Sequence, residues 1–99
     1  MEIADFIPFG HDNGVTAREL SQITGITERK IRDRIALERH NVVILNLQDG
    51  QGYFRPTEDE KSLVWEWVRQ EENRLRSIGY GLKAARKVVR GLWANGSIG

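Results

Sequence analysis

The sequence predicts a mainly α-helical fold that contains one small β-hairpin and continues into a C-terminal helical extension. Two Thr-x-x-Glu capping boxes predict helix starts, one at Thr16 and one at Thr57. Between them, an Asp-Gly turn separates two short segments rich in β-branched and aromatic residues, which is typical of a hairpin. We therefore expect a domain over residues 1–56 and a helical arm over residues 57–99.

The composition excludes several classes of protein. The 99 residues are enough for one domain, and the chain has no cysteine for a disulfide or a thiolate metal site. No apolar run approaches the roughly 18 residues that a membrane-spanning helix needs. The acidic start, MEIADF, does not resemble a signal peptide. We expect a cytoplasmic protein with no membrane partner.

The charge is unevenly distributed, although the net charge is only +1. Residues 1–15 carry a charge of −3 and residues 16–56 a charge of +2. Residues 57–72 carry −4, whereas residues 73–99 contain six bases and no acid. The local distribution of charge is therefore more informative about partners than the overall balance.

A short helix over residues 2–7 and a second helix beginning at Thr16 are expected first. In the second one, Leu20 and Ile23 are three residues apart and share a face. Gly25 can adopt the positive φ that ends a helix.

The next helix, over residues 28–39, is the candidate DNA reader. Thr27 can cap it, and Ile31 and Ile35 form its buried stripe. Two helices joined by a tight turn are the helix-turn-helix pattern, in which the second helix enters the major groove. Its outer face carries Arg29, Arg32, Asp33 and Ala36, with Lys30 and Arg34 on its two sides. The alternative is the solvated polar face that every surface helix has.

A β-hairpin is expected after this helix. Residues 42–48 predict a strand, residues 49–52 (DGQG) a tight turn, and residues 53–55 the returning strand. Because a two-stranded hairpin is only marginally stable alone, we expect it to pack on the helices through Tyr53 or Phe54.

This order of elements resembles the winged helix-turn-helix domain. The likeness is to the N-terminal domain of the biotin operon repressor and to DeoR-like regulators, whose wing has an I…GxGY pattern that Ile44 to Tyr53 supplies here. It covers roughly residues 3–56. The whole chain is also similar to small helix-turn-helix proteins encoded by prophages.

The resemblance implies a set of DNA contacts. Arg29 or Arg32 would bind a guanine, and Lys30 and Arg34 would hold phosphates. By position in the family pattern, the residues that would face the major groove are Thr27, Arg29, Lys30, Arg32 and Asp33. Those that would lie on the wing are Gln51 and Arg55. The chain departs from the pattern at the wing tip, which carries Asp49 and no Lys or Arg.

The arm is predicted to contain two helices. The first, at about 58–78, is apolar over most of the circumference of its first half, which includes Trp65 and Trp67. Such a surface needs a cover, either a second subunit, giving a homodimer through this helix, or the C-terminal helix folded back onto it. Gly79-Tyr80-Gly81 is expected to break the helix.

A short basic helix is then predicted at about 82–93. Its cationic face admits three interpretations: docking on the acidic helix start around residues 58–66, contact with phosphates, or attachment to a membrane surface. We favour docking, and the membrane surface is the weakest of the three.

No motif in the chain predicts catalysis. There is no Gly-rich phosphate loop before a helix, no nucleophile elbow and no pair of His ligands. We therefore expect a non-enzyme without metal or cofactor. The predicted function is double-stranded DNA binding by a small bacterial or phage transcriptional regulator. The alternatives are a DNA-architectural or replication accessory factor, and a winged-helix module that binds protein.

Overall fold

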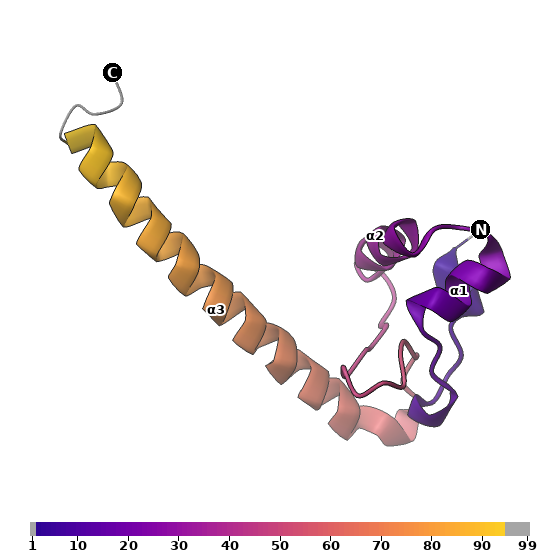
Figure 1. Ribbon diagram of the computed structural model, residues 1–99. Coiled ribbons are helices and arrows are strands. Elements are labelled where there is room, and N and C mark those ends of the chain that lie inside the picture. Colours follow the sequence, from indigo (N-terminus) through magenta and orange to yellow (C-terminus); the bar gives the residue numbers. More distant parts are fainter. Residues whose placement is uncertain (1, 95–99) are drawn as a thin grey trace. The chain divides into compact units, whose positions relative to one another are not determined.

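The computed structural model describes residues 2–94 of the chain, with side chains up to residue 91. Its elements are three 3₁₀-helices, η1 (Ile3–Phe6), η2 (His11–Asn13) and η3 (Glu58–Glu60), and three α-helices, α1 (Ala17–Thr24), α2 (Glu28–Glu38) and α3 (Lys61–Ala94) (Figure 1). The chain divides into two compact units, Met1–Trp67 and Val68–Gly99. The first unit thus extends beyond residue 56, where the predicted domain ends.

The predicted starts and ends of α1 and α2 are confirmed. The Thr16 hydroxyl accepts the N–H of Glu19 at 3.1 Å, and the Glu19 carboxylate accepts the N–H of Thr16 at 3.2 Å. Gly25 ends α1 in the left-handed region, at φ 76°. The Thr27 hydroxyl accepts the N–H of Lys30 at the start of α2. Local side-chain chemistry therefore sets both helices and the turn between them.

The core of the first unit joins η1, α1 and α2 to the segment that follows. Its fully buried large side chains are Ile3, Leu20, Ile31, Ile35, Ile44, Leu45 and Phe54. Ile23 does not join them: it is three residues from Leu20, as the shared face requires, but it is 61% exposed. The buried side of α1 runs through Ala17 and Leu20, and Ile23 lies off its edge at 100° per residue.

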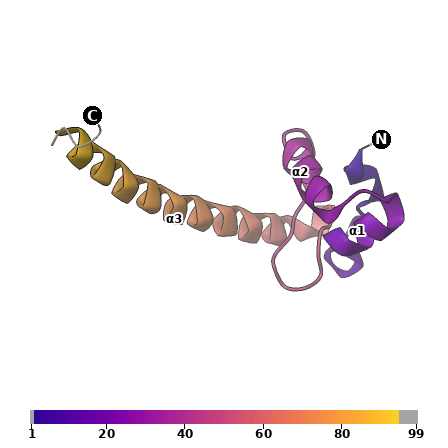
Figure 2. The same cartoon turned by 45° about the horizontal axis from the view of Figure 1, so that its top comes forward.

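The predicted hairpin is not confirmed. Residues 2–94 contain no β-strand, and only three isolated β-bridges are present. One of these, Leu45 with Phe54, is antiparallel and joins the two predicted strands through N–H···O bonds of 2.9 and 3.0 Å. Figures 1 and 2 show the chain between α2 and α3 as an irregular loop. Of the two residues expected to pack on the helices, half-buried Tyr53 packs against the helical core, and Phe54 is fully buried.

The returning segment pairs instead with the N-terminal part of the chain. Tyr53 forms an antiparallel bridge with Val15, and Arg55 a parallel bridge with Phe9. These contacts outside the hairpin replace the ladder that residues 42–48 would have supplied. A Cβ at Gly52 would collide with the Val15 carbonyl oxygen, so the close approach of these backbones requires glycine.

The break predicted at Gly79-Tyr80-Gly81 is wrong, because α3 is one helix from Lys61 to Ala94. Glycine within a helix costs only about 0.5–1 kcal/mol relative to alanine, and the flanking residues 82–90 are mostly good helix formers. The predicted helices at 58–78 and 82–93 are therefore one element, and the second cannot fold back to dock on the first. Residues 95–99 of the predicted arm lie outside the described residues.

The start of α3 is anchored within the first unit. The Glu60 carboxylate accepts the N–H of Thr57 at 2.9 Å, in the predicted capping box. The Arg39 guanidinium lies over the rings of Tyr53 and Trp67, 5.8 and 5.1 Å from their centroids, and donates from Nε to the Ile44 carbonyl oxygen at 2.9 Å. Arg39 thus joins the end of α2, the following loop and the first turns of α3.

Within residues 2–94, no helix combines the length and the apolar character that crossing a bilayer requires.

Candidate nucleic-acid interface

The orientation of α2 is fixed by its buried face. Ile31 and Ile35 are 0% and 1% exposed, so the residues about half a turn away from them must point to solvent. Arg29, Arg32 and Asp33 are all exposed. Lys30 and Arg34 are exposed too, but they lie on one flank of α2 and not on its two sides as predicted, because residues four apart share a side of a helix. All five charged residues that the sequence predicts for the reading helix are therefore exposed around the part of α2 that is not buried.

Three of these cations are not neutralised within the chain. Across the described residues, no ion pair or hydrogen bond engages the side chains of Arg29, Lys30 or Arg34. Arg32 differs, because its Nη2 lies 3.4 Å from Glu28 Oε1, one helical turn earlier. Both partners are about half exposed, so this pair contributes little and can exchange for another acceptor.

Thr27, predicted as a groove contact, has a structural role at the same end of α2. Its hydroxyl caps the helix through the N–H of Lys30, at 3.4 Å. The side chain is exposed, so the capping contact leaves it at the surface beside the cations.

Glu38 faces away from this surface and holds η1, a role that the sequence pattern did not predict. Its two carboxylate oxygens accept the N–H groups of Ile3 and Ala4, at 2.9 and 2.8 Å. Glu38 follows Ile31 and Ile35 at helical spacing, and this pattern could have placed it on the buried side. Because Glu28 is paired with Arg32, Asp33 is the acid on the outer face of α2 without a cationic partner among the described residues.

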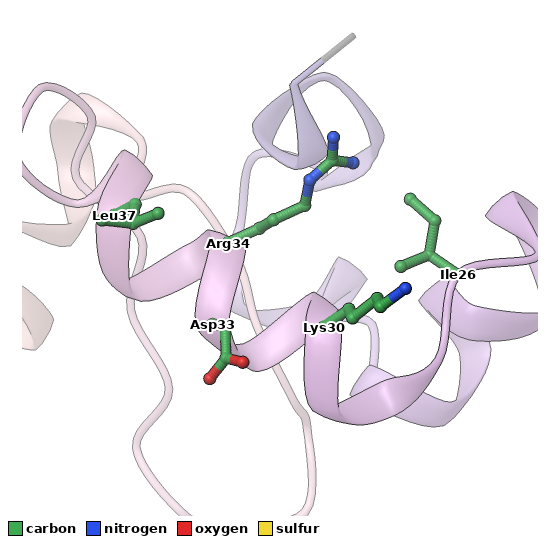
Figure 3. A pocket seen from close by; sticks show the side chains of 5 residues that line it. All are labelled: Ile26, Lys30, Asp33, Arg34 and Leu37. Carbon is green, nitrogen blue, oxygen red and sulfur yellow. The ribbon is translucent and has the colours of Figure 1, made fainter.

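A shallow depression of about 350 Å³ lies along one flank of α2. Its lining residues are Ile26, Lys30, Asp33, Arg34 and Leu37 (Figure 3). Figure 3 shows Lys30 and Ile26 pointing toward one another, with Asp33 and Arg34 on different sides of the helix. Leu37 is 69% exposed. The two apolar residues were not predicted, although residues 26, 30, 33 and 37 share the spacing of one helical side.

The two predicted wing residues lie elsewhere in the first unit. Gln51 is exposed in the loop, where its N–H donates to Asp49 Oδ1 at 3.1 Å. The Arg55 guanidinium lies over the Phe9 ring, 4.4 Å from its centroid, and the Arg55 N–H donates to the Pro8 carbonyl at 2.9 Å. Neither side chain lines the depression beside α2.

His11 connects the loop tip to the start of α3. Its Nε2 is 2.6 Å from Asp49 Oδ2, its backbone N–H donates to Glu60 Oε2 at 2.9 Å, and its ring packs edge-on against Phe54. The pKa of the Asp49 carboxyl is lowered, first by the N–H of Gln51 and then by His11. The pKa of Glu60 is lowered by the N–H of Thr57 and then by that of His11. Asp49 therefore stabilises the loop through its contacts with His11 and Gln51.

Among the described residues, no three His, Cys, Asp or Glu side chains come together as potential ligands of a metal ion. Comparison with protein-family models, curated proteins and solved structures finds no match to this chain.

Proposed function

We propose that this chain is a small cytoplasmic DNA-binding protein of the bacterial or phage regulator type, which contacts double-stranded DNA through the outer face of α2. The observation that carries the proposal is the set of three exposed cations, Arg29, Lys30 and Arg34, with no partner among the described residues. A capped helix with its other face buried holds them in place. Exposed, unpaired Arg and Lys side chains on one helix are the electrostatic footprint of phosphate binding.

The first turns of α2 would read base edges. Arg29 would donate two of its guanidinium N–H groups to O6 and N7 of a guanine, a contact that typically contributes about 1–3 kcal/mol of discrimination. Arg32 can do the same after exchanging Glu28, 3.4 Å away, for the base. Asp33 can accept a hydrogen bond from the amino group of cytosine.

Residues on the flank of α2 would hold the backbone. Lys30 and Arg34 are both exposed and line the depression beside α2 (Figure 3). Contacts of this kind fix the register of the helix but carry no sequence information.

Binding of the purified full chain to DNA at two salt concentrations tests the proposal. The probes are a random duplex and duplexes from the genomic neighbourhood of the gene. The double variant Lys30→Ala/Arg34→Ala should weaken binding to all sequences and reduce the dependence of log affinity on log salt by about two phosphate contacts. Arg29→Ala should lower affinity for a preferred site more than for random DNA.

The matched control is Lys83→Ala/Lys87→Ala, which removes the same charge from exposed positions of α3. An unchanged salt dependence in this control assigns the contact to α2. Equal losses of DNA affinity in the two double variants would contradict this assignment and indicate attraction by net charge alone. Absence of binding at low salt would exclude a DNA-binding function.

The depression beside α2 favours a second candidate, a protein-binding module. Exposed Leu37 and half-buried Ile26 provide an apolar floor flanked by Lys30 and Arg34, a combination suited to an amphipathic acidic segment. Leu37→Ala separates the two functions, because it should leave DNA affinity unchanged but weaken binding of a protein partner.

A further inference from the structure

The continuity of α3 joins two apolar stripes into one. Along the helix, a set of mostly apolar residues is spaced at alternating steps of four and three residues from residue 64 to residue 89. We call these positions the seam, and it comprises Val64, Val68, Glu71, Leu75, Ile78, Leu82, Ala85 and Val89. This repeat of 3.5 residues, sustained over more than three heptads, is the pattern of a left-handed coiled coil.

The seam is exposed from Leu75 onward, whereas Val64, Val68 and Glu71 are half-buried. Leu75, Ile78, Leu82 and Val89 are 67, 52, 50 and 47% exposed. Every described side chain from residue 72 to residue 91 is exposed. A long regular helix gains most of its stability from packing of its apolar face. We therefore expect a partner to cover the seam. Residues 82–94 cannot cover it, because they continue the same helix.

Two glycines lie beside the middle of the seam. Gly79 and Gly81 lie between the seam residues Ile78 and Leu82. A Cβ at either position would meet nothing within 4 Å. Packing within the described chain therefore does not require glycine at these positions, although glycine weakens a helix. Small residues beside a seam reduce the bulk that would hold a second helix away, since the distance between helix axes depends on the side chains at the contact.

The charge pattern identifies the partner and its direction. The acids of α3 end at Glu72: residues 64–72 contain three acids and one base, a net charge of −2, and six bases with no acid follow. Two parallel copies would place like charges side by side over the whole length. Two antiparallel copies place the acidic half of each beside the basic half of the other.

The flanking positions support the same direction. Glu72 and Arg86 each directly follow a seam residue and are each seven residues from Gly79. An antiparallel pair centred near Gly79 brings Glu72 of one copy toward Arg86 of the other, and two-fold symmetry repeats the contact. We propose that the seam of α3 binds the seam of a second copy of this chain in the antiparallel direction.

Glu71 is the polar member of the seam. It lies 3.5 Å from Arg74 Nη1, one turn along the same helix. A charged seam residue lowers the stability of a coiled coil but restricts its register. The proposal rests on α3 alone and is independent of whether α2 binds DNA.

Because the natural chain has no cysteine, single cysteines introduced into the full-length protein report the direction of pairing. Val68→Cys and Val89→Cys lie on the seam about 30 Å apart, at 1.5 Å per residue. In an antiparallel pair, a mixture of the two variants forms the mixed disulfide, and neither variant crosslinks to itself. In a parallel pair, each variant crosslinks to itself, which would overturn the proposed direction.

The oligomeric mass, measured by sedimentation equilibrium, tests whether the seam is the interface. Leu82→Asn places an amide on the seam and should raise the dissociation constant of the dimer by about tenfold or more. Tyr80→Asn is the matched control, since Tyr80 is 69% exposed on the opposite face of the helix. A wild-type chain that remains monomeric would overturn the proposal, as would equal effects of the two substitutions. Helical circular dichroism of both variants distinguishes loss of pairing from loss of the helix.

Discussion

The first compact unit and the C-terminal part of α3 have the same helical periodicity of apolar residues, but these residues have different surroundings. In α1 and α2, Leu20, Ile31 and Ile35 are buried against other segments. In α3, Leu75 and Ile78 are equally regular and more than half exposed. The comparison shows that periodicity predicts the apolar face of a helix but says nothing about what covers it. The cover in the first unit comes from residues distant in sequence, such as Ile3 and Ile44.

The largest predicted effect separates the two regions directly. Phe54→Ala removes a fully buried ring that packs against the His11 ring, and we expect it to lower the free energy of unfolding by about 3–5 kcal/mol. Leu75→Ala, at a 67% exposed position, should change the transition of the first unit by less than about 0.5 kcal/mol. Urea titration at low protein concentration measures both. Similar losses would contradict the separation into two regions.

Two glycines in the same loop test the backbone packing of the first unit. Gly50 and Gly52 both have positive φ, 89° and 86°, but only a Cβ at Gly52 would collide with the Val15 carbonyl. Gly50→Ala should cost about 1–2 kcal/mol from the left-handed conformation alone. Gly52→Ala should cost more, because the paired segment must also move. Thermal unfolding of the two variants compares them, and equal costs would show that the contact with Val15 is unimportant.

The inward and outward faces of α2 can be compared through two acids. Glu38→Ala leaves the N–H groups of Ile3 and Ala4 without their acceptor, and we expect a loss of about 1–3 kcal/mol in unfolding free energy. Asp33→Ala, on the exposed face, should change stability by less than about 0.5 kcal/mol. A neutral Glu38→Ala in urea titration would mean that η1 is held by its apolar contacts alone.

The glycines in α3 should respond in the opposite direction to those of the loop. Gly79→Ala and Gly81→Ala place a methyl group in open space on a helix, so each should stabilise the helix by about 0.5–1 kcal/mol. Amide hydrogen exchange across residues 75–85 measures the change. Slower exchange is expected, whereas unchanged exchange would indicate that the chain is not helical there in solution.

The smallest predicted effect concerns the His11 contacts at the loop tip. Asp49 and Glu60 have lowered pKa values in the folded chain, so their ionised forms stabilise it above the ordinary carboxyl range near pH 4. This stabilisation is lost as the pH falls through and below that range. Both carboxyls are near the surface, so the effect is modest. The double variant Asp49→Asn/Glu60→Gln should show a smaller drop in Tm on acidification than the wild type. An identical drop would place the acid sensitivity elsewhere.

The sequence by itself determined the features that depend on a few neighbouring residues. The capping box of Thr16 with Glu19, the left-handed Gly25 and the buried pair Ile31 and Ile35 were all predictable. Each depends on hydrogen bonds or steric limits within about one helical turn, which any surroundings leave intact. The exposed position of the α2 cations follows from that buried pair.

Only the tertiary structure decided the features in which distant segments compete. The returning segment at Tyr53 pairs with Val15, and the Arg55 side chain lies over Phe9. Glu38 turns inward to the N–H groups of η1. Alternative partners for a strand or a carboxylate differ by small free energies, and they are selected by long-range packing that local patterns do not contain. The helix through Gly79 and Gly81 has a different cause, because a local effect, the helix propensity of the residues on both sides, outweighs their weak helix-breaking tendency.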